Sequence, residues 1–139
     1  MRWGNPDVTF VGDPNGSMSA LTGYGVYAAP IARAATAAGV SVLTQGRGIS
    51  ASTVYADLIA SHPVIAWVTS DYGRDPVSTW TAWDGSAVTY SLREHAVLLV
   101  GVTPTQVVIN DPWWGTIWRS RQQFEAAYST LGDMAVVIR

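Results

Sequence analysis

The stretches REHAVLLVG (residues 93–101) and VVINDPWW (residues 107–114) decide the fold of this chain. Each contains an apolar run of strand length that is rich in Val, Leu or Ile. Thr103-Pro104-Thr105 between them has the composition of a turn. The two stretches therefore predict a β-hairpin that has His95 at the start of its first strand and Asp111 at the end of its second.

The register of this hairpin decides whether the two polar side chains meet. Paired antiparallel strands lie about 4.8 Å apart, and their side chains alternate between the two faces. If Val102 lies opposite Gln106, then Val97 lies opposite Asp111. His95 is then the diagonal neighbour of Asp111 on the same face, roughly 6–7 Å away. A slip of one residue would send the two side chains to opposite faces.

On the favourable register, the pair has the chemistry of a general base and its orienting group. The Asp111 carboxylate can accept a hydrogen bond from one imidazole nitrogen of His95, which leaves the other nitrogen to take a proton. A structural alternative stays open at this point. A lone histidine at the start of a buried strand is often a packed core residue, and Asn-Asp-Pro is an ordinary turn at the end of a strand.

The remaining segments predict an α+β fold with a mainly antiparallel sheet and flanking helices. Caps and apolar periodicity indicate helices, whereas continuous apolar runs and an Asp84-Gly85 turn indicate strands. The predicted helices cover residues 28–38, 51–60 and 120–131, and the predicted strands cover residues 64–68, a hairpin within 80–90, and 135–138. Residues 1–23 are rich in turn formers, and the polar residues 71–78 are a candidate for a mobile rim of a cleft.

Composition excludes several classes of function. The chain has 139 residues, of which 48% are hydrophobic, so it can form a packed core. Only 13% of the residues are charged and the formal net charge is −2, which argues against a nucleic-acid partner. There is no run of roughly 18 apolar residues that would span a membrane, and no signal peptide is recognisable. We expect a soluble chain without a membrane partner, and its compartment stays open.

Neither a metal nor a cofactor is expected. His62, the second histidine, precedes Pro63 in a predicted turn and is expected to be solvated. A zinc site built from His62, His95 and carboxylates would lack any recognisable ligand spacing. No phosphate-binding glycine motif is present. We therefore assign no metal and no cofactor to this sequence.

Several motifs together resemble those of the C39-like peptidases, which have a papain-like cysteine-protease fold. EHAVLLVG at residues 94–101 and NDPW at 110–113 resemble the C-terminal part of the family. Asn5-Pro6, FVG at 10–12 and GYGVY at 23–27 resemble an earlier segment. The resemblance extends over nearly the whole chain, so residues 1–139 are expected to form one C39-like domain that represents part of the papain-like fold.

This resemblance implies a Cys-His-Asp triad, with His95 as general base and Asp111 as its orienting carboxylate. The family's nucleophilic cysteine lies upstream on a helix, and this chain contains no cysteine. Without a nucleophile no acyl-enzyme forms. Three explanations stay open: the chain is the C-terminal part of a longer peptidase, it is a domain that lost its activity, or another polypeptide supplies the cysteine. Ser17 and Ser19 lack the surroundings of a nucleophile elbow and are expected to be loop residues.

Aromatic residues near the predicted hairpin and helix are candidates for the substrate cleft. These are Tyr24, Tyr27, Trp67 and Trp113. Trp113, together with Trp114 and Trp118, is expected either to cover the His-Asp pair or to fill the core beneath the last helix. The expected partners are a peptide or protein substrate and an upstream segment or second chain that bears the cysteine. Two alternatives are an inactive domain that binds peptides and an unrelated α+β binding domain with a purely structural hairpin.

Overall fold

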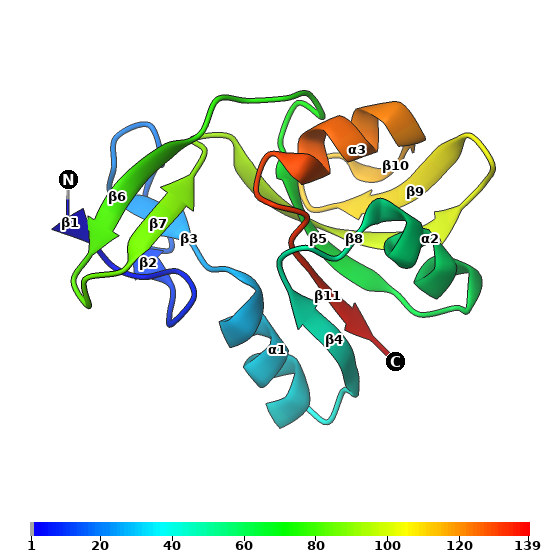
Figure 1. Ribbon diagram of the computed structural model, residues 1–139, viewed down its shortest axis with the longest axis horizontal. Coiled ribbons are helices and arrows are strands. Elements are labelled where there is room, and N and C mark those ends of the chain that lie inside the picture. The colour runs from blue at the N-terminus through cyan, green and yellow to red at the C-terminus, as the bar shows by residue number, and fades with distance from the viewer. Residues whose placement is uncertain (1) are drawn as a thin grey trace.

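The computed structural model describes residues 2–139 as an assembly of short and long strands with three helices (Figure 1). The strands are β1 (Arg2–Trp3), β2 (Val11–Gly12), β3 (Gly23–Gly25), β4 (Val42–Gly46), β5 (Val64–Thr69), β6 (Ser78–Ala82), β7 (Ala87–Tyr90), β8 (Glu94–Val102), β9 (Gln106–Asp111), β10 (Gly115–Ser120) and β11 (Ala135–Ile138). The helices are α1 (Ala28–Ala37), α2 (Ala51–Ile59) and α3 (Arg121–Ser129).

A six-stranded antiparallel sheet is the centre of the structure. Its strand order is β10-β9-β8-β5-β11-β4, and each neighbouring pair is antiparallel. The expectation of an α+β fold with a mainly antiparallel sheet is confirmed. The predicted hairpin forms the β8-β9 pair, so the polar residues singled out from the sequence lie inside the main sheet.

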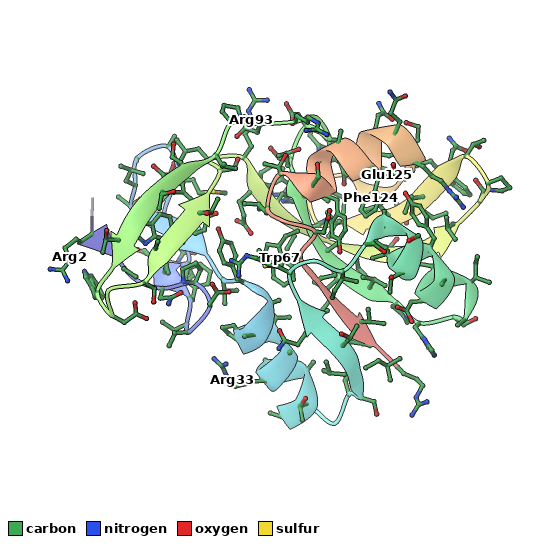
Figure 2. All side chains as sticks on the ribbon, viewed as in Figure 1. Arg2, Arg33, Trp67, Arg93, Phe124 and Glu125 are labelled. Carbon is green, nitrogen blue, oxygen red and sulfur yellow. The ribbon has the colours of Figure 1, made fainter. Side chains whose placement is uncertain are left out.

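Two apolar cores cover the two faces of this sheet. The first core lies beneath α2 and α3, which contribute Val54, Leu58, Phe124 and Tyr128. The second core lies between the other face, α1 and the N-terminal elements (Figure 1). Trp67 belongs to this second core, and Figure 2 shows it where the large sheet meets the N-terminal elements. β5 is therefore buried on both faces, as its continuous apolar sequence predicts.

The caps explain where the predicted helices begin. Ser50 accepts a hydrogen bond from the Thr53 amide at the start of α2. Ser120 and Gln123 form the predicted capping box of α3. One packing prediction is wrong: Ile59, expected on the apolar face of α2, is 74% exposed. It lies at the edge of the arc formed by Val54, Tyr55 and Leu58, so its side chain points past the first core.

Two strands of the large sheet were not predicted from the sequence. β4 and β10 lie at the two edges of the sheet, and most of their side chains are exposed or half-buried. An edge strand pairs on one side only, so its sequence needs no continuous apolar run. The predicted hairpin around Asp84-Gly85 is present as β6 and β7, but it belongs to a separate three-stranded sheet with β1. Across residues 2–139, none of the helices is both long and apolar enough to traverse a lipid bilayer.

The capping box gives a first testable prediction. Ser120→Ala removes the acceptor of the Gln123 amide hydrogen bond (3.1 Å) and should lower the free energy of unfolding by about 1 kcal/mol. Urea unfolding followed by circular dichroism measures this change. Ser129→Ala, at the exposed end of the same helix, is the matched control and should change the stability little. Equal effects of the two substitutions would contradict the capping role.

Candidate active site

A β-bulge in β8 sets the face on which His95 lies. Near the turn, Val102 pairs with Val107, not with Gln106 as the sequence-based register assumed. The register then shifts by one residue between Leu99 and Gly101. From Leu99 toward His95 the pairing matches the predicted register, and its continuation places Val97 opposite Asp111. Without the bulge the Val102–Val107 register would carry His95 to the opposite face from Asp111.

His95 and Asp111 are in direct contact. The distance from His95 Nε2 to Asp111 Oδ1 is 3.0 Å, and the two residues are only 6% and 3% exposed. A carboxylate accepts hydrogen bonds, so this contact assigns the proton to Nε2 in the neutral imidazole. Within residues 2–139, no side chain makes a hydrogen bond to Nδ1. The second nitrogen is therefore left to accept a proton.

Three donors surround the Asp111 carboxylate. Oδ1 accepts from the Trp113 amide (2.8 Å) in addition to His95, and Oδ2 accepts from the Tyr72 hydroxyl (2.7 Å). Burial by itself raises the pKa of a carboxyl group, but the hydrogen bonds from Tyr72, His95 and Trp113 outweigh it and hold the pKa of Asp111 below its usual value. Asp111 is therefore ionised at neutral pH, as an orienting group must be.

Trp113 covers the imidazole. The ring centroids of Trp113 and His95 are 4.4 Å apart with an interplanar angle of 31°. The outer face of Trp113 remains in solvent, since the residue is 62% exposed. Trp114 and Trp118 are also half or more exposed, so these tryptophans do not fill the core beneath α3. Trp113 shields the His-Asp hydrogen bond from water, which strengthens it.

A cavity of about 390 Å³ opens beside His95. Its walls are mainly apolar and come from both the N-terminal segment and the large sheet, among them Phe10, Met18, Ile31, Trp67 and Trp113. Its polar groups are His95 and Glu94. Volume and lining are those of a site that binds a side chain or a short segment.

Glu94 is a buried carboxyl group that the sequence reasoning did not single out. It is 7% exposed, and burial raises its pKa to about 8. Gly25, at φ +145°, lies so close that a Cβ atom there would be 3.1 Å from Glu94 Oε2. A glycine is therefore required at this point of β3. Strand alternation predicts that Glu94 and His95 point to opposite faces, but nothing local in the sequence shows that a carboxylate is buried there.

The sequence of this chain matches a known family. Residues 1–136 match the model of the Peptidase C39 like family. The chain belongs to this family. The resemblance that the His95 and Asp111 motifs indicated is confirmed.

Two relatives of this C39-like chain are longer than the chain itself. It is 34% identical over 139 residues to the uncharacterized protein YvpB of Bacillus subtilis (strain 168). The aligned region covers 98% of this chain and 53% of YvpB. The crystal structure of a protein named as a C39-like peptidase from Bacillus anthracis matches with a TM-score of 0.84 and 27% identity, over 98% of this chain and 69% of that chain. The chain thus spans about half the length of the curated relative that it matches.

Two of the four cleft candidates of the C39-like chain lie elsewhere. Tyr24 and Tyr27 are 4% and 0% exposed and belong to the second core. Their hydroxyl oxygens are 2.7 Å apart, and the Tyr27 hydroxyl donates to the Thr89 carbonyl. Neither tyrosine lines the cavity beside His95, whereas Trp67 and Trp113 both do. The tyrosines are core residues because the N-terminal segment folds over them.

The other histidine and the candidate serines are also distant from this pair. His62 precedes β5, whereas His95 pairs with Val68 near the other end of that strand. His62 is not simply solvated, because its Nδ1 lies 3.3 Å from Asp57. Ser17 and Ser19 are exposed and contact each other, and neither lines the His95 cavity. Within residues 2–139, no three His, Asp or Glu side chains are grouped to hold a metal ion.

Proposed function

We propose that this chain is the His/Asp-bearing part of a cysteine peptidase that hydrolyses peptide bonds once a cysteine-bearing segment completes it. The observation that carries the proposal is the buried His95–Asp111 contact, with Nδ1 left unbonded by residues 2–139. A further part of a longer polypeptide, or a second chain, would supply the cysteine. The chain itself has none.

The two nitrogens of His95 have different roles in this chemistry: Nδ1 transfers protons, and Nε2 keeps its proton. His95 Nδ1 takes the proton of the cysteine thiol, and the thiolate attacks the carbonyl carbon of the scissile peptide. The imidazolium then gives this proton to the leaving amine, and an acyl-enzyme remains. Water, deprotonated by the same nitrogen, releases the acid and restores the thiol. Throughout these steps, Asp111 holds Nε2–H and stabilises the imidazolium.

An open apolar area on the strands that carry the pair supports completion by another segment. On the face opposite α2 and α3, α1 packs against β4 and β11, at the other end of the sheet. The face of β8, β9 and β10 carries half-buried Leu98 and Val108, and Trp118 is 50% exposed. A second cavity of about 350 Å³ on this face is lined by Ile65 and Ala96, which also line the His95 cavity. Asp111 also lines the second cavity, so a segment bound there would lie next to the pair.

A second candidate function is a non-catalytic domain that binds peptides through the same cavity. The absence of cysteine from the sequence favours it. The third hypothesis assumed a domain unrelated to the family, and that assumption is wrong because the chain belongs to the C39-like family. Both remaining functions use the open cavity beside His95, so the supply of a cysteine distinguishes them.

Co-expression tests the proposal directly. The chain is produced with a segment that bears the family's cysteine, and the complex is assayed on a fluorogenic peptide library. We expect cleavage by the complex and no measurable peptidase activity from the isolated chain. Peptide binding without cleavage by a stable complex would instead support the non-catalytic function.

A further inference from the structure

We propose that Tyr72 is the positioning residue that fixes the Asp111 carboxylate against His95. This inference rests on the proposed function of the His95–Asp111 pair. Tyr72 was not singled out in the sequence, because it lies in the loop between β5 and β6 and contacts Asp111 across 39 residues of chain.

The geometry shows why a second attachment to Asp111 matters. His95 and the Trp113 amide both bond to Oδ1, at 3.0 and 2.8 Å. The terminal torsion of an aspartate is broad, so contacts to one oxygen alone leave the carboxylate plane free to turn. Tyr72 is 4% exposed, and its hydroxyl donates to Oδ2 at 2.7 Å. The carboxylate is therefore held at both oxygens, with Oδ1 facing Nε2.

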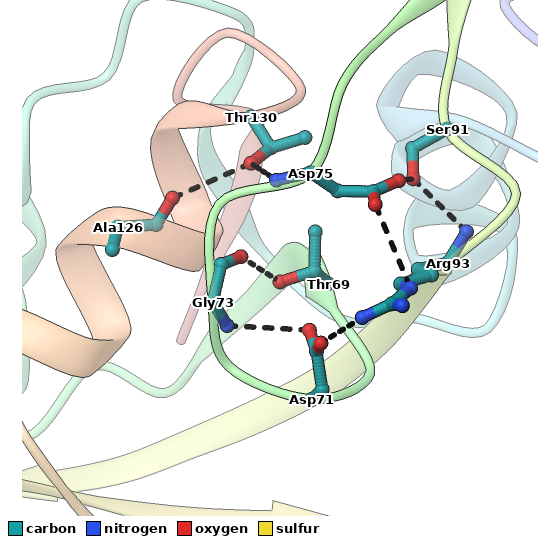
Figure 3. Close-up of polar contacts among 8 residues, drawn as sticks. All are labelled: Thr69, Asp71, Gly73, Asp75, Ser91, Arg93, Ala126 and Thr130. Atoms are coloured by element: carbon teal, nitrogen blue, oxygen red, sulfur yellow. Dashed lines mark hydrogen bonds and ion pairs between the residues drawn. The ribbon is translucent and has the colours of Figure 1, made fainter.

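The backbone at Tyr72 is held in an uncommon conformation. Its φ is +57°, in the left-handed region that non-glycine residues rarely adopt. Such a conformation persists where the surrounding contacts determine it. The Tyr72 amide donates to the Thr69 carbonyl at 3.0 Å, and the Thr69 hydroxyl donates to the Gly73 carbonyl (Figure 3). These contacts turn the chain so that the phenol points at Asp111.

Arg93 ties this loop to the strand that carries His95. Its guanidinium pairs with Asp71 and with Asp75 (Figure 3). In the sequence, Tyr72 lies between these two aspartates. Arg93 lies two residues before His95, so the loop and the start of β8 are joined through one side chain. On the other side, the Arg119 guanidinium of β10 lies 4.8 Å from the centroid of the Tyr72 ring. The phenol is thus located by contacts from both neighbouring elements.

The Tyr72 hydroxyl stays protonated and can therefore always donate its hydrogen bond to Asp111. Burial, followed by the hydrogen bond to Asp111 and the charge of that carboxylate, raises the pKa of Tyr72 above its ordinary value. Glu94, the other carboxyl group near His95, lines the cavity, whereas Tyr72 is not part of that lining. The Tyr72 hydroxyl keeps its proton at every pH at which a cysteine peptidase works.

The chain offers a matched control for Tyr72. The Tyr55 hydroxyl donates to Glu125 Oε1 at 2.8 Å, and the Arg121 guanidinium lies 4.3 Å from the Tyr55 ring centroid. This arrangement copies the phenol, carboxylate and guanidinium of the Tyr72 site without a histidine. Tyr55→Phe therefore removes an equivalent hydrogen bond away from the candidate active site.

The test measures which nitrogen of His95 carries the proton. The isolated chain is labelled with ¹⁵N, and the side chains of its two histidines are observed by NMR at a pH where the imidazoles are neutral. Tyr72→Phe should lower the ratio of the Nε2–H to the Nδ1–H tautomer of His95 by about threefold or more, as expected for loss of one orienting hydrogen bond. His62 in the same spectra, and His95 in Tyr55→Phe, should keep their ratios.

An unchanged tautomer ratio in a folded Tyr72→Phe variant overturns the inference. Should that variant unfold, the wild-type chain provides a second measurement. The Tyr72 hydroxyl proton should then be protected from exchange with water because it is buried and bonded to Asp111. A rapidly exchanging hydroxyl proton would also overturn the inference.

The two proposals fail in distinguishable ways, because the NMR measurement requires no cysteine. A changed tautomer ratio together with an inactive complex rejects the peptidase proposal and keeps the role of Tyr72 in orienting Asp111. Cleavage by the complex together with an unchanged ratio rejects Tyr72 alone. In an active complex, Tyr72→Phe should lower kcat about tenfold and leave KM unchanged, since Tyr72 touches no substrate.

Discussion

In a complex completed with a cysteine, His95→Ala is expected to lower kcat/KM by about 10³-fold or more, because no other group beside the cavity can take the thiol proton at neutral pH. Asp111→Ala should reduce kcat/KM by a factor at least about tenfold smaller than His95→Ala does, since the imidazole can still act as a base when its orienting group is lost. Initial rates on a fluorogenic peptide measure both effects. The expectation follows from the buried Nε2–Oδ1 contact of 3.0 Å.

His62→Ala is the matched control for this experiment. It removes the only other histidine of the chain, which lies at the far end of β5 and pairs with Asp57. Its kcat/KM should equal that of the unmodified complex. An active His95→Ala complex would rule out the assignment of the general base, whatever the effect of Asp111→Ala.

Glu94→Gln is expected to stabilise the isolated chain by about 2–4 kcal/mol at pH 8. Burial raises the pKa of Glu94 to about 8, from a usual value of 4.5. The folded chain therefore binds a proton that the unfolded chain has lost. The resulting stabilisation is fully present below about pH 4.5 and is lost as the pH rises through about 8. Glutamine keeps the shape of the side chain and carries no charge, so the Glu94→Gln variant does not lose stability as the pH rises through this range.

Urea unfolding at pH 5 and pH 8 measures the effect of Glu94→Gln. The unmodified chain should be less stable at pH 8, and the variant should lose most of that difference. Glu125→Gln is the control, because Glu125 is the only other glutamate and is exposed. The same pH dependence in Glu94→Gln and the unmodified chain would show that Glu94 is not the group responsible.

Asp111 affects the pH dependence of the free energy of unfolding in the opposite direction to Glu94, and at lower pH. Its burial would raise its pKa, but its three hydrogen bonds lower the pKa below the usual 3.8. The stability that these bonds contribute is present above that usual value and is lost as the pH falls through the lowered pKa. Glu94 and Asp111 therefore act in separate pH windows, and the measurements at pH 5 and pH 8 report on Glu94.

The arrangement of the candidate site was only partly predictable. The motifs around His95 and Asp111 predicted a hairpin with both residues at one end, and that hairpin exists as β8 and β9. The assumed pairing of Val102 with Gln106 is wrong, because Val102 pairs with Val107. The bulge between Leu99 and Gly101 shifts the register by one residue, so the part of the strand that contains His95 has the predicted register. Local sequence does not specify a bulge, because packing on both faces of the sheet selects it.

Tyr72 and Glu94 show a second limit of sequence reasoning. Tyr72 lies in a polar loop that was expected only to line a cleft, and its partner Asp111 is 39 residues away. Glu94 stands next to His95 in the sequence, yet its burial depends on Gly25 and the N-terminal segment. Contacts between distant segments create both environments, and no pattern within either segment carries that information.

The sequence by itself determined the α+β class, the caps of α2 and α3, the buried central strand β5, the family resemblance and the absence of a cysteine. These features follow from local propensity, apolar periodicity and residue identity, which need no knowledge of neighbours in space. The tertiary structure decided the face of His95, the second hydrogen bond to Asp111, the burial of Glu94 and the core positions of Tyr24 and Tyr27. Each of these depends on which distant segments pack together, and packing is set by the whole chain.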